Sequence, residues 1–443
     1  MTLRLPRGRN APGPRWDAVQ IVLVASLLQQ VWRLQDLFHW LRLWGLPIGL
    51  SVASLLLFAL DHDSRRRLRL DAPIVRIACG IFCLVVLSIP GSLYPGESFA
   101  FFIKEYWRAF LLLVLIAGSA RTLLDVERVA AAQLAGAALF CVIVLSRYTV
   151  GTNGRLGELE DYDTNDLALV IVCTLPLAIY VFARSRQFVV RGAVLVAGAC
   201  LMATLAKTGS RGGFVGLLAV MGYLAVFGRA VPVGKRLAAV AVTLLFLVTF
   251  ASSRYWDMMQ TILHPTSDYN WSGQGDIGRM ELWKRGLGYM AAYPFLGVGA
   301  SAYSSAEGTL APQAARQEHG IGFKWSTAHN SFLEIGVELG VLGLVLFVAG
   351  FVSGFRTLAR IGRGPPGRAP LLAQTLGASL AGYAVSGFFL SAAYWPYLYA
   401  LLGMIAALDT VAAPHAAPRP ARAAGWRSAA QFMPQTPGTG GSV

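Results

Sequence analysis

The chain has 443 residues, of which 55% are hydrophobic and 14% are charged, whereas soluble domains carry about 25% charged residues. This composition excludes a soluble globular protein and indicates a polytopic α-helical membrane protein. A net charge of +15 would suggest nucleic-acid binding in a soluble chain. In a membrane protein it reflects topology instead, so no nucleic-acid partner is expected. All five cysteines fall in apolar segments, so no disulfide framework is expected.

Apolar segments long enough to cross about 30 Å of hydrocarbon recur along the whole chain. The first of them leads straight into further spans without a cleavage-site pattern, so no cleavable signal peptide is expected. We place twelve spans at 17–34, 44–60, 73–92, 104–120, 127–146, 166–183, 192–206, 213–228, 237–252, 328–355, 371–390 and 394–412.

The distribution of basic residues predicts the orientation of these spans. With the N-terminus in the cytoplasm, the cytoplasmic stretches hold 24 of the 38 Lys and Arg residues, although the other side has the longest loop. The positive-inside rule therefore predicts that both termini are cytoplasmic. The expected parts are a cytoplasmic tail (1–16), spans one to nine (17–252), an extracytoplasmic loop (253–327), spans ten to twelve (328–413) and a disordered tail rich in Ala, Pro and Gly (414–443).

The loop at 253–327 contains one segment with a clear helical pattern. Residues 276–293 repeat apolar side chains at helical spacing and are followed by Pro294, which predicts an amphipathic helix. Residues 296–305 are predicted to form a turn rich in Gly and Ser, and 311–327 cannot be assigned.

Basic residues on the external side are informative because topology does not explain them. Arg211 lies in the short turn KTGSRGG, whose glycines would let the backbone approach a ligand closely. Lys104 and Arg108 are one helical turn apart, and Arg147 and Arg155 follow at the next external boundary. Arginines that converge from several segments would suit a phosphate or pyrophosphate, although each one alone could simply reach the lipid headgroups.

His329 stands at the start of the tenth span, beside Asn330. An imidazole titrates near neutral pH and can accept a proton from an attacking hydroxyl, but a histidine at this place could also be a cap or an interfacial residue. Glu334 and Glu338 lie deeper in the same span, where a carboxylate is costly unless it has a partner. No metal-ligand spacing and no G-x-S-x-G motif occurs, so no metal and no cofactor are expected.

Four sequence motifs together resemble the O-antigen ligase and polymerase family of bacterial envelope glycosyltransferases. They are AHNSFLEIGVELGVLG at 328–343, GRMELWKRGLGYMAAYPFLGVG at 278–299, the SRGG turn at 210–213 and the D-x-N-D-L-A run at 163–168. Their order and spacing agree with the family from about 150 to 350.

The resemblance implies a glycosyltransferase of the bacterial inner membrane, all-α, with about twelve transmembrane helices, one large periplasmic loop and a GT-C-like architecture. It implies transfer of O-antigen from undecaprenyl diphosphate to a sugar hydroxyl of lipid A–core at the periplasmic face, without metal and with inversion. The membrane lipids are the expected surroundings, and the oligomeric state stays open, a monomer included. An O-antigen polymerase and a protein-directed oligosaccharyltransferase are the related alternatives. A lipid-linked glycan flippase is the alternative from another class.

Carried over to this chain, the resemblance makes His329 the general base and assigns the diphosphate to Arg211 and Arg279. Further expected substrate contacts, matched less securely, are Arg155, Lys104, Arg108, Arg147, Asn330 and Trp283.

Overall fold

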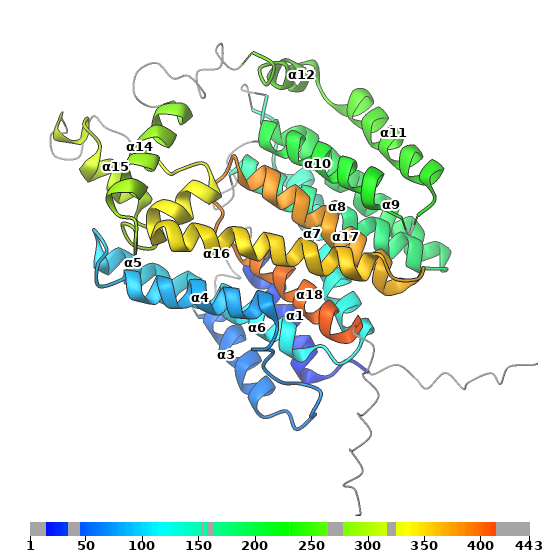
Figure 1. Ribbon diagram of the computed structural model, residues 1–443. Helices are drawn as coiled ribbons and strands as arrows, with labels where there is room; N and C mark the ends of the chain where they lie inside the picture. The colour runs from blue at the N-terminus through cyan, green and yellow to red at the C-terminus, as the bar shows by residue number, and fades with distance from the viewer. Residues whose placement is uncertain are drawn as a thin grey trace, which may run out of the picture. The chain divides into compact units, whose positions relative to one another are not determined.

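The structure is a computed structural model that describes residues 15–33, 45–151, 154–156, 163–229, 231–264, 278–316 and 325–412. In these residues the chain forms helices and no β-strand (Figure 1). The bundle helices are α1 (Ala18–Trp32), α3 (Leu46–Ala59), α4 (Pro73–Ser88), α5 (Pro95–Phe101), the π-helical turn η2 (Phe102–Tyr106), α6 (Trp107–Ser119), α7 (Leu123–Arg147), α8 (Thr164–Arg184), α9 (Phe188–Thr208), α10 (Arg211–Phe227), α11 (Val233–Phe250), α16 (Ser331–Gly362), α17 (Arg368–Gly387) and α18 (Pro396–Ala412). The shorter elements between α11 and α16 are α12 (Ser253–Gln260), α14 (Arg279–Ala292), α15 (Tyr303–Leu310) and η4 (Ala314–Arg316).

Each predicted span overlaps one of these bundle helices, with ends that differ by a few residues. Five helices of the described chain, α7, α8, α9, α11 and α16, are long and apolar enough to cross a membrane. Five shorter apolar helices are α1, α3, α4, α10 and α18. The all-α membrane class agrees with these helices, whereas twelve crossings and a GT-C-like topology stay predictions.

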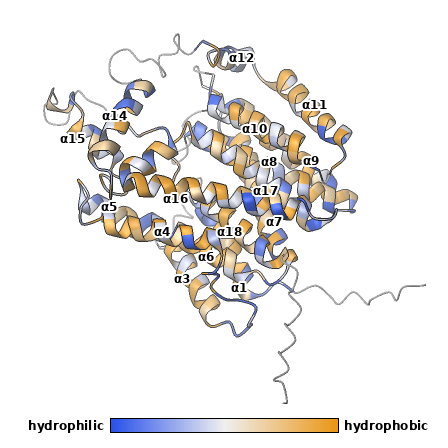
Figure 2. Ribbon diagram, viewed as in Figure 1, coloured by the Kyte–Doolittle hydropathy of each residue, from blue (hydrophilic) through white to orange (hydrophobic). Residues whose placement is uncertain are grey.

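Helix α11 shows why a bilayer is the medium that suits this surface. Its side chains Val242, Leu245 and Val248 are 63–65% exposed, and nearly the whole helix is apolar (Figure 2). An exposed apolar stripe of this length would be costly in water but is favourable against lipid tails.

Helix α16 lies between α4 and α17 (Figure 1), and α17 also packs against α8 and α10. Small residues allow this close packing. A Cβ atom on Gly216 of α10 would lie 1.9 Å from Ser386 Oγ of α17, and one on Gly213 would lie 2.6 Å from the Ala168 Cβ of α8. The glycines of α10 therefore serve helix–helix contact, as small residues do in membrane bundles.

The end of the bundle that carries the connection from α3 to α4 holds an ion-pair network. The buried guanidinium of Arg66 bonds both Asp17 and Asp61, and Arg121 pairs with Asp17 at 2.6 Å. The backbone N–H of Asp63, and after it Arg66, lower the pKa of the Asp61 carboxyl. These charges therefore neutralise one another at this end.

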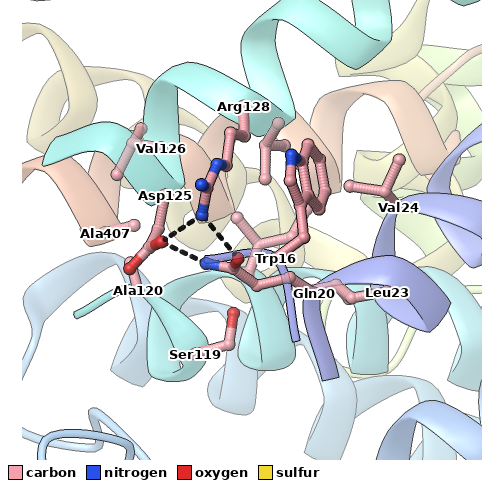
Figure 3. Close-up of a pocket in the computed structure, with 12 residues that line it drawn as sticks. Trp16, Gln20, Leu23, Val24, Ser119, Ala120, Asp125, Val126, Arg128 and Ala407 are labelled. Atoms are coloured by element: carbon pink, nitrogen blue, oxygen red, sulfur yellow. Dashed lines mark hydrogen bonds and ion pairs between the residues drawn. The ribbon is translucent and has the colours of Figure 1, made fainter. Parts of the chain in front are cut away.

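A small pocket lies next to this network (Figure 3). There Arg128 donates to Gln20 Oε1 at 2.9 Å and lies 3.4 Å from the Asp125 carboxylate. The pocket holds only about 10 Å³, room for at most about one water molecule. Its polar groups bond one another, so it has a structural role.

The predicted helix at 276–293 is confirmed as α14, Arg279–Ala292. The predicted turn at 296–305 is wrong in its last part, because α15 begins at Tyr303. The start of α15 is capped by a residue distant in the sequence, because backbone N–H groups there donate to Glu338 of α16. Sequence spacing does not reveal such a cap. Of the unassigned stretch 311–327, residues 317–324 lie outside the described residues, as does the predicted tail at 414–443.

Candidate active site

His329 lies in the turn that leads into α16. Its backbone takes a left-handed conformation with φ 47°, and its N–H donates to Ser391 Oγ at 2.9 Å. Asn330 caps α16, because its side-chain oxygen accepts from the N–H groups of Phe332 and Leu333 at 3.0 and 3.1 Å. The histidine is thus held between a capped helix start and the connection from α17 to α18.

Residues 386–391, which we call the α17–α18 turn, contact all three predicted catalytic segments. Ser386 Oγ donates to the carbonyl of Gly212, the neighbour of Arg211, at 3.3 Å. The ring of Phe388 packs edge-on against Trp283, one helical turn after Arg279, with centroids 5.4 Å apart. Since Ser391 accepts from the N–H of His329, segments that are far apart in the sequence meet at one end of the bundle.

Trp283 links α14 directly to the histidine turn. Its indole N–H donates to the carbonyl of Ala328 at 3.0 Å. The structure therefore gives the polar groups of Trp283 and Asn330 contacts with the backbone on both sides of His329. These two residues, which the sequence suggested as substrate contacts, position the histidine.

Arg211 is the first residue of α10, whose N-cap Ser210 accepts from the N–H of Gly213 at 3.1 Å. Its guanidinium donates to Thr261 Oγ1, just after α12, at 2.8 Å. The sequence suggested that the flanking glycines admit a ligand. The structure shows another reason at Gly209, where φ is 60° and a Cβ atom would lie 2.5 Å from Met258 Cε.

Arg155 lies beside the same turn. Its guanidinium donates to the carbonyl of Thr208 at 3.0 Å and to Asn165 Oδ1 at 2.8 Å. The run that contains Asn165, one of the four motifs, therefore orients Arg155 next to the start of α10. A cation supported in this way loses less side-chain entropy when it binds an anion.

The remaining predicted basic residues lie in the η2–α6 segment, at the end of α7 and at the start of α14. Lys104 is exposed in the π-helical turn η2, and its carbonyl accepts from Nε of Arg108 at 2.8 Å. Arg147 is exposed in the last turn of α7. Arg279 is half-buried at the start of α14, directly after residues outside the described chain. Contacts thus join the segments of Arg211, Arg279 and His329 at the α17–α18 turn, and Arg155 lies beside the start of α10.

Helix α16 is broken at Gly340, where φ is 73° and ψ is −174°. The segment 294–299 fills the break: Val341 N–H donates to the Pro294 carbonyl at 2.8 Å, and Val298 N–H donates to the Val337 carbonyl at 2.9 Å. A Cβ atom on Gly340 would lie 2.4 Å from the Pro294 oxygen. Backbone groups freed inside a membrane helix must find partners, and this segment supplies them.

Glu338 ties the same break to α15. Its carboxylate accepts from the N–H groups of Ser301 and Tyr303 at 2.8 and 3.1 Å. Glu334 accepts from the N–H of Ala393 at 3.0 Å. The sequence required partners for these costly carboxylates, and the structure supplies backbone donors. Among the described residues, neither carboxylate forms an ion pair with an arginine.

The elements α14 and α15 are joined by a buried ion pair. Arg285 and the fully buried Glu307 are 2.6 Å apart, and the Tyr289 hydroxyl donates to Glu307 at 3.0 Å. Burial, and then the charge of Glu307, raise the pKa of the Tyr289 phenol, which keeps it a hydrogen-bond donor. The helix that carries Arg279 and Trp283 is therefore joined to α15 by a buried ion pair and a hydrogen bond.

A cavity of about 390 Å³ adjoins the histidine turn. It is lined by residues of α1, the η2–α6 segment, α16 and the stretch 391–397, and Ser391 and Glu334 form part of its wall. Ser391 contacts the backbone of His329 and the cavity at once. In the described part of the chain, no cluster of three His, Cys, Asp or Glu residues could hold a metal ion.

Residues 194–348 match the family described as O-Antigen ligase. This part of the chain is similar to the O-antigen ligase family. The matched region contains Arg211, Arg279 and His329, and it indicates an enzyme of ligase or polymerase type that acts on lipid-linked glycans in a membrane. A comparison with curated proteins finds no match.

Proposed function

We propose that this protein is an O-antigen ligase, which transfers a polysaccharide from undecaprenyl diphosphate to a sugar hydroxyl of lipid A–core at the periplasmic face of the bacterial inner membrane. The observation that carries the proposal is the meeting of the Arg211, Arg279 and His329 segments at the α17–α18 turn. A base and two cations at one end of a membrane bundle suit chemistry on a lipid-borne anion.

In the proposed reaction the acceptor hydroxyl attacks the anomeric carbon of the donor sugar while the bond to the diphosphate breaks. His329 accepts the hydroxyl proton, and the leaving diphosphate takes the bonding electron pair. Arg211 and Arg279 stabilise the negative charge that develops on the diphosphate, and Arg155 supports the start of α10. Arginine can supply this stabilisation without a metal, and direct attack inverts the anomeric configuration.

The proposed function is tested by reconstituting the purified protein in liposomes with undecaprenyl-diphosphate-linked O-antigen and rough lipopolysaccharide in EDTA. We expect a ladder of glycan attached to lipid A–core, with an unchanged rate when EDTA is present. Omitting the rough lipopolysaccharide should abolish product. Lengthening of the glycan without the acceptor would instead identify a polymerase, and loss of the ladder in EDTA would contradict metal independence.

A further inference from the structure

The short helix α12 packs against the start of α10. The rings of Tyr255, which is only 1% exposed, and Trp256 meet the ring of Phe214 edge-on, with centroids 6.4 and 6.3 Å apart. Met258 of the same helix reaches the α9–α10 turn, because a Cβ atom on Gly209 would lie 2.5 Å from its Cε atom. These contacts fix the end of α12 beside the first residues of α10.

Thr261 directly follows α12 and contacts Arg211. The guanidinium donates through Nη1 to Thr261 Oγ1 at 2.8 Å. The hydroxyl of Thr261 in turn donates to the carbonyl of Met258, also at 2.8 Å. A hydroxyl has one proton and two lone pairs. Because the proton is bonded to Met258, Thr261 presents a fixed acceptor to the guanidinium.

Arg211 is therefore held at both ends. Its backbone is fixed by the N-cap of α10, where Ser210 Oγ accepts from the N–H of Gly213 at 3.1 Å, and the tip of its side chain is held by Thr261. A side chain that is oriented in advance loses less conformational entropy when it binds an anion. Since the hydroxyl is uncharged, this contact orients the guanidinium without cancelling its positive charge.

Arg155 is held in a similar way on the other side of the α9–α10 turn. Its guanidinium donates to the carbonyl of Thr208 and to Asn165 Oδ1. A Cβ atom on Gly209 would lie 3.1 Å from Arg155 Cγ, so this glycine lies between Arg155 and Met258 of α12. Two arginines that neutral oxygens orient on either side of one turn suit an anion with several oxygens.

We infer that Thr261 is a positioning residue for glycan transfer, which holds the guanidinium of Arg211 in the orientation that binds the leaving diphosphate. This inference rests on the proposed function and deepens it, because it gives the end of α12 a role in the site. A threonine that only supported the fold would act independently of Arg211.

The test compares Thr261→Val, which keeps the branched shape and removes the hydroxyl, with Thr261→Ser, which keeps the hydroxyl. In the reconstituted transfer assay, Thr261→Val should lower kcat about tenfold, as expected for one lost hydrogen bond to a charged group. The KM for the lipid-linked glycan should change little, because the charge on the diphosphate develops at the transfer step. Thr261→Ser should keep most of the wild-type rate. An unchanged kcat in Thr261→Val would overturn the inference.

A double-mutant cycle with Arg211→Ala separates positioning from support of the fold. If Thr261 acts through Arg211, adding Thr261→Val to Arg211→Ala should lower kcat no further. A further loss by about the same factor as in the single variant would overturn the inference, because the threonine would then act without the arginine. Thr261→Ala takes the place of Thr261→Val should the valine variant fail to fold.

The matched control is Thr309→Val in α15. The hydroxyl of Thr309 donates to the carbonyl of Ser305 at 2.7 Å, a local bond like that from Thr261 to Met258. This variant should keep the wild-type kcat. A loss of rate as large as that of Thr261→Val would contradict a specific role for Thr261.

Binding without turnover separates this inference from the proposed function. Inorganic pyrophosphate, which resembles the leaving group, should bind Thr261→Val about tenfold more weakly than wild type in isothermal titration calorimetry. Thr261→Ser and Thr309→Val should bind it as wild type does. Equal binding by wild type and Thr261→Val would overturn the inference. Pyrophosphate binding that depends on Thr261 in a protein that makes no ladder would overturn the proposed function alone.

Discussion

Replacing His329 with asparagine is expected to lower kcat for glycan transfer by about 10²–10⁴-fold, the usual contribution of a general base. Asparagine is the informative choice because His329 has a φ of 47°. Asn tolerates the left-handed region better than most residues, so the backbone contact with Ser391 should persist. The amide cannot take up the proton of the acceptor hydroxyl, so the chemical step should slow while the KM values change little.

The matched control for this variant is His62→Asn. His62 is exposed in the connection from α3 to α4, at the end of the bundle that holds the Arg66 ion-pair network. It should leave transfer unchanged. A His329→Asn enzyme with a wild-type rate would contradict the assignment of the base. A large fall in the thermal midpoint of this variant would mean that its slower transfer comes from damage to the fold.

Removing the guanidinium of Arg211 should also lower kcat strongly. Arg211→Ala is expected to reduce it by about 10²–10³-fold, because stabilisation of charge on the leaving diphosphate is lost at the step where that charge develops. The start of α10 should persist, since Ser210 still caps the helix. Arg211→Lys keeps the positive charge but not the two-pronged geometry, so we expect a partial recovery that stays below the wild-type rate.

The corresponding control is Arg65→Lys. Arg65 is exposed and pairs with Asp63 at the opposite end of the bundle, so its replacement should not affect transfer. A wild-type rate for Arg211→Lys would refute bidentate contact with the diphosphate. A wild-type rate for Arg211→Ala would show that Arg211 does not contribute to transfer.

The positions of the bundle helices could be predicted from the sequence because a run of apolar residues is itself the cause of a membrane helix. Helix α8, for example, begins at Thr164 directly after its N-cap Asp163, which accepts from the N–H of Asn165. A local signal of this kind fixes an element without knowledge of its neighbours.

The break in α16 could not be predicted, because its cause is not local. The run at 331–362 is continuous in hydrophobicity, and Gly340 alone does not indicate a break. The backbone groups that bond the break come from Pro294 and Val298, about forty residues earlier in the chain. Helix α15 could not be predicted for the same reason, because a long-range contact caps its start: the carboxylate of Glu338 accepts from the N–H of Tyr303.

The sequence singles out candidate site residues but not the contacts that surround them. His329 and Arg211 carry sequence signals, since each is a polar residue at the end of an apolar segment, and Arg279 lies near the start of the predicted amphipathic helix. The cavity beside the histidine turn carries little sequence signal, because its wall comes from α1, the η2–α6 segment, α16 and the stretch 391–397, which are far apart in the chain. The role of the α17–α18 turn required knowledge of which helices are neighbours.

The central claim is a single displacement at the anomeric carbon with His329 as the base. It is tested most directly by the anomeric configuration of the new linkage, measured by NMR on the product of one round of transfer from a donor of known configuration. The account predicts that the configuration is inverted and that the His329→Asn variant forms this inverted linkage more slowly than the wild type. Retention of configuration would require a covalent glycosyl intermediate and two displacements, and it would contradict this site.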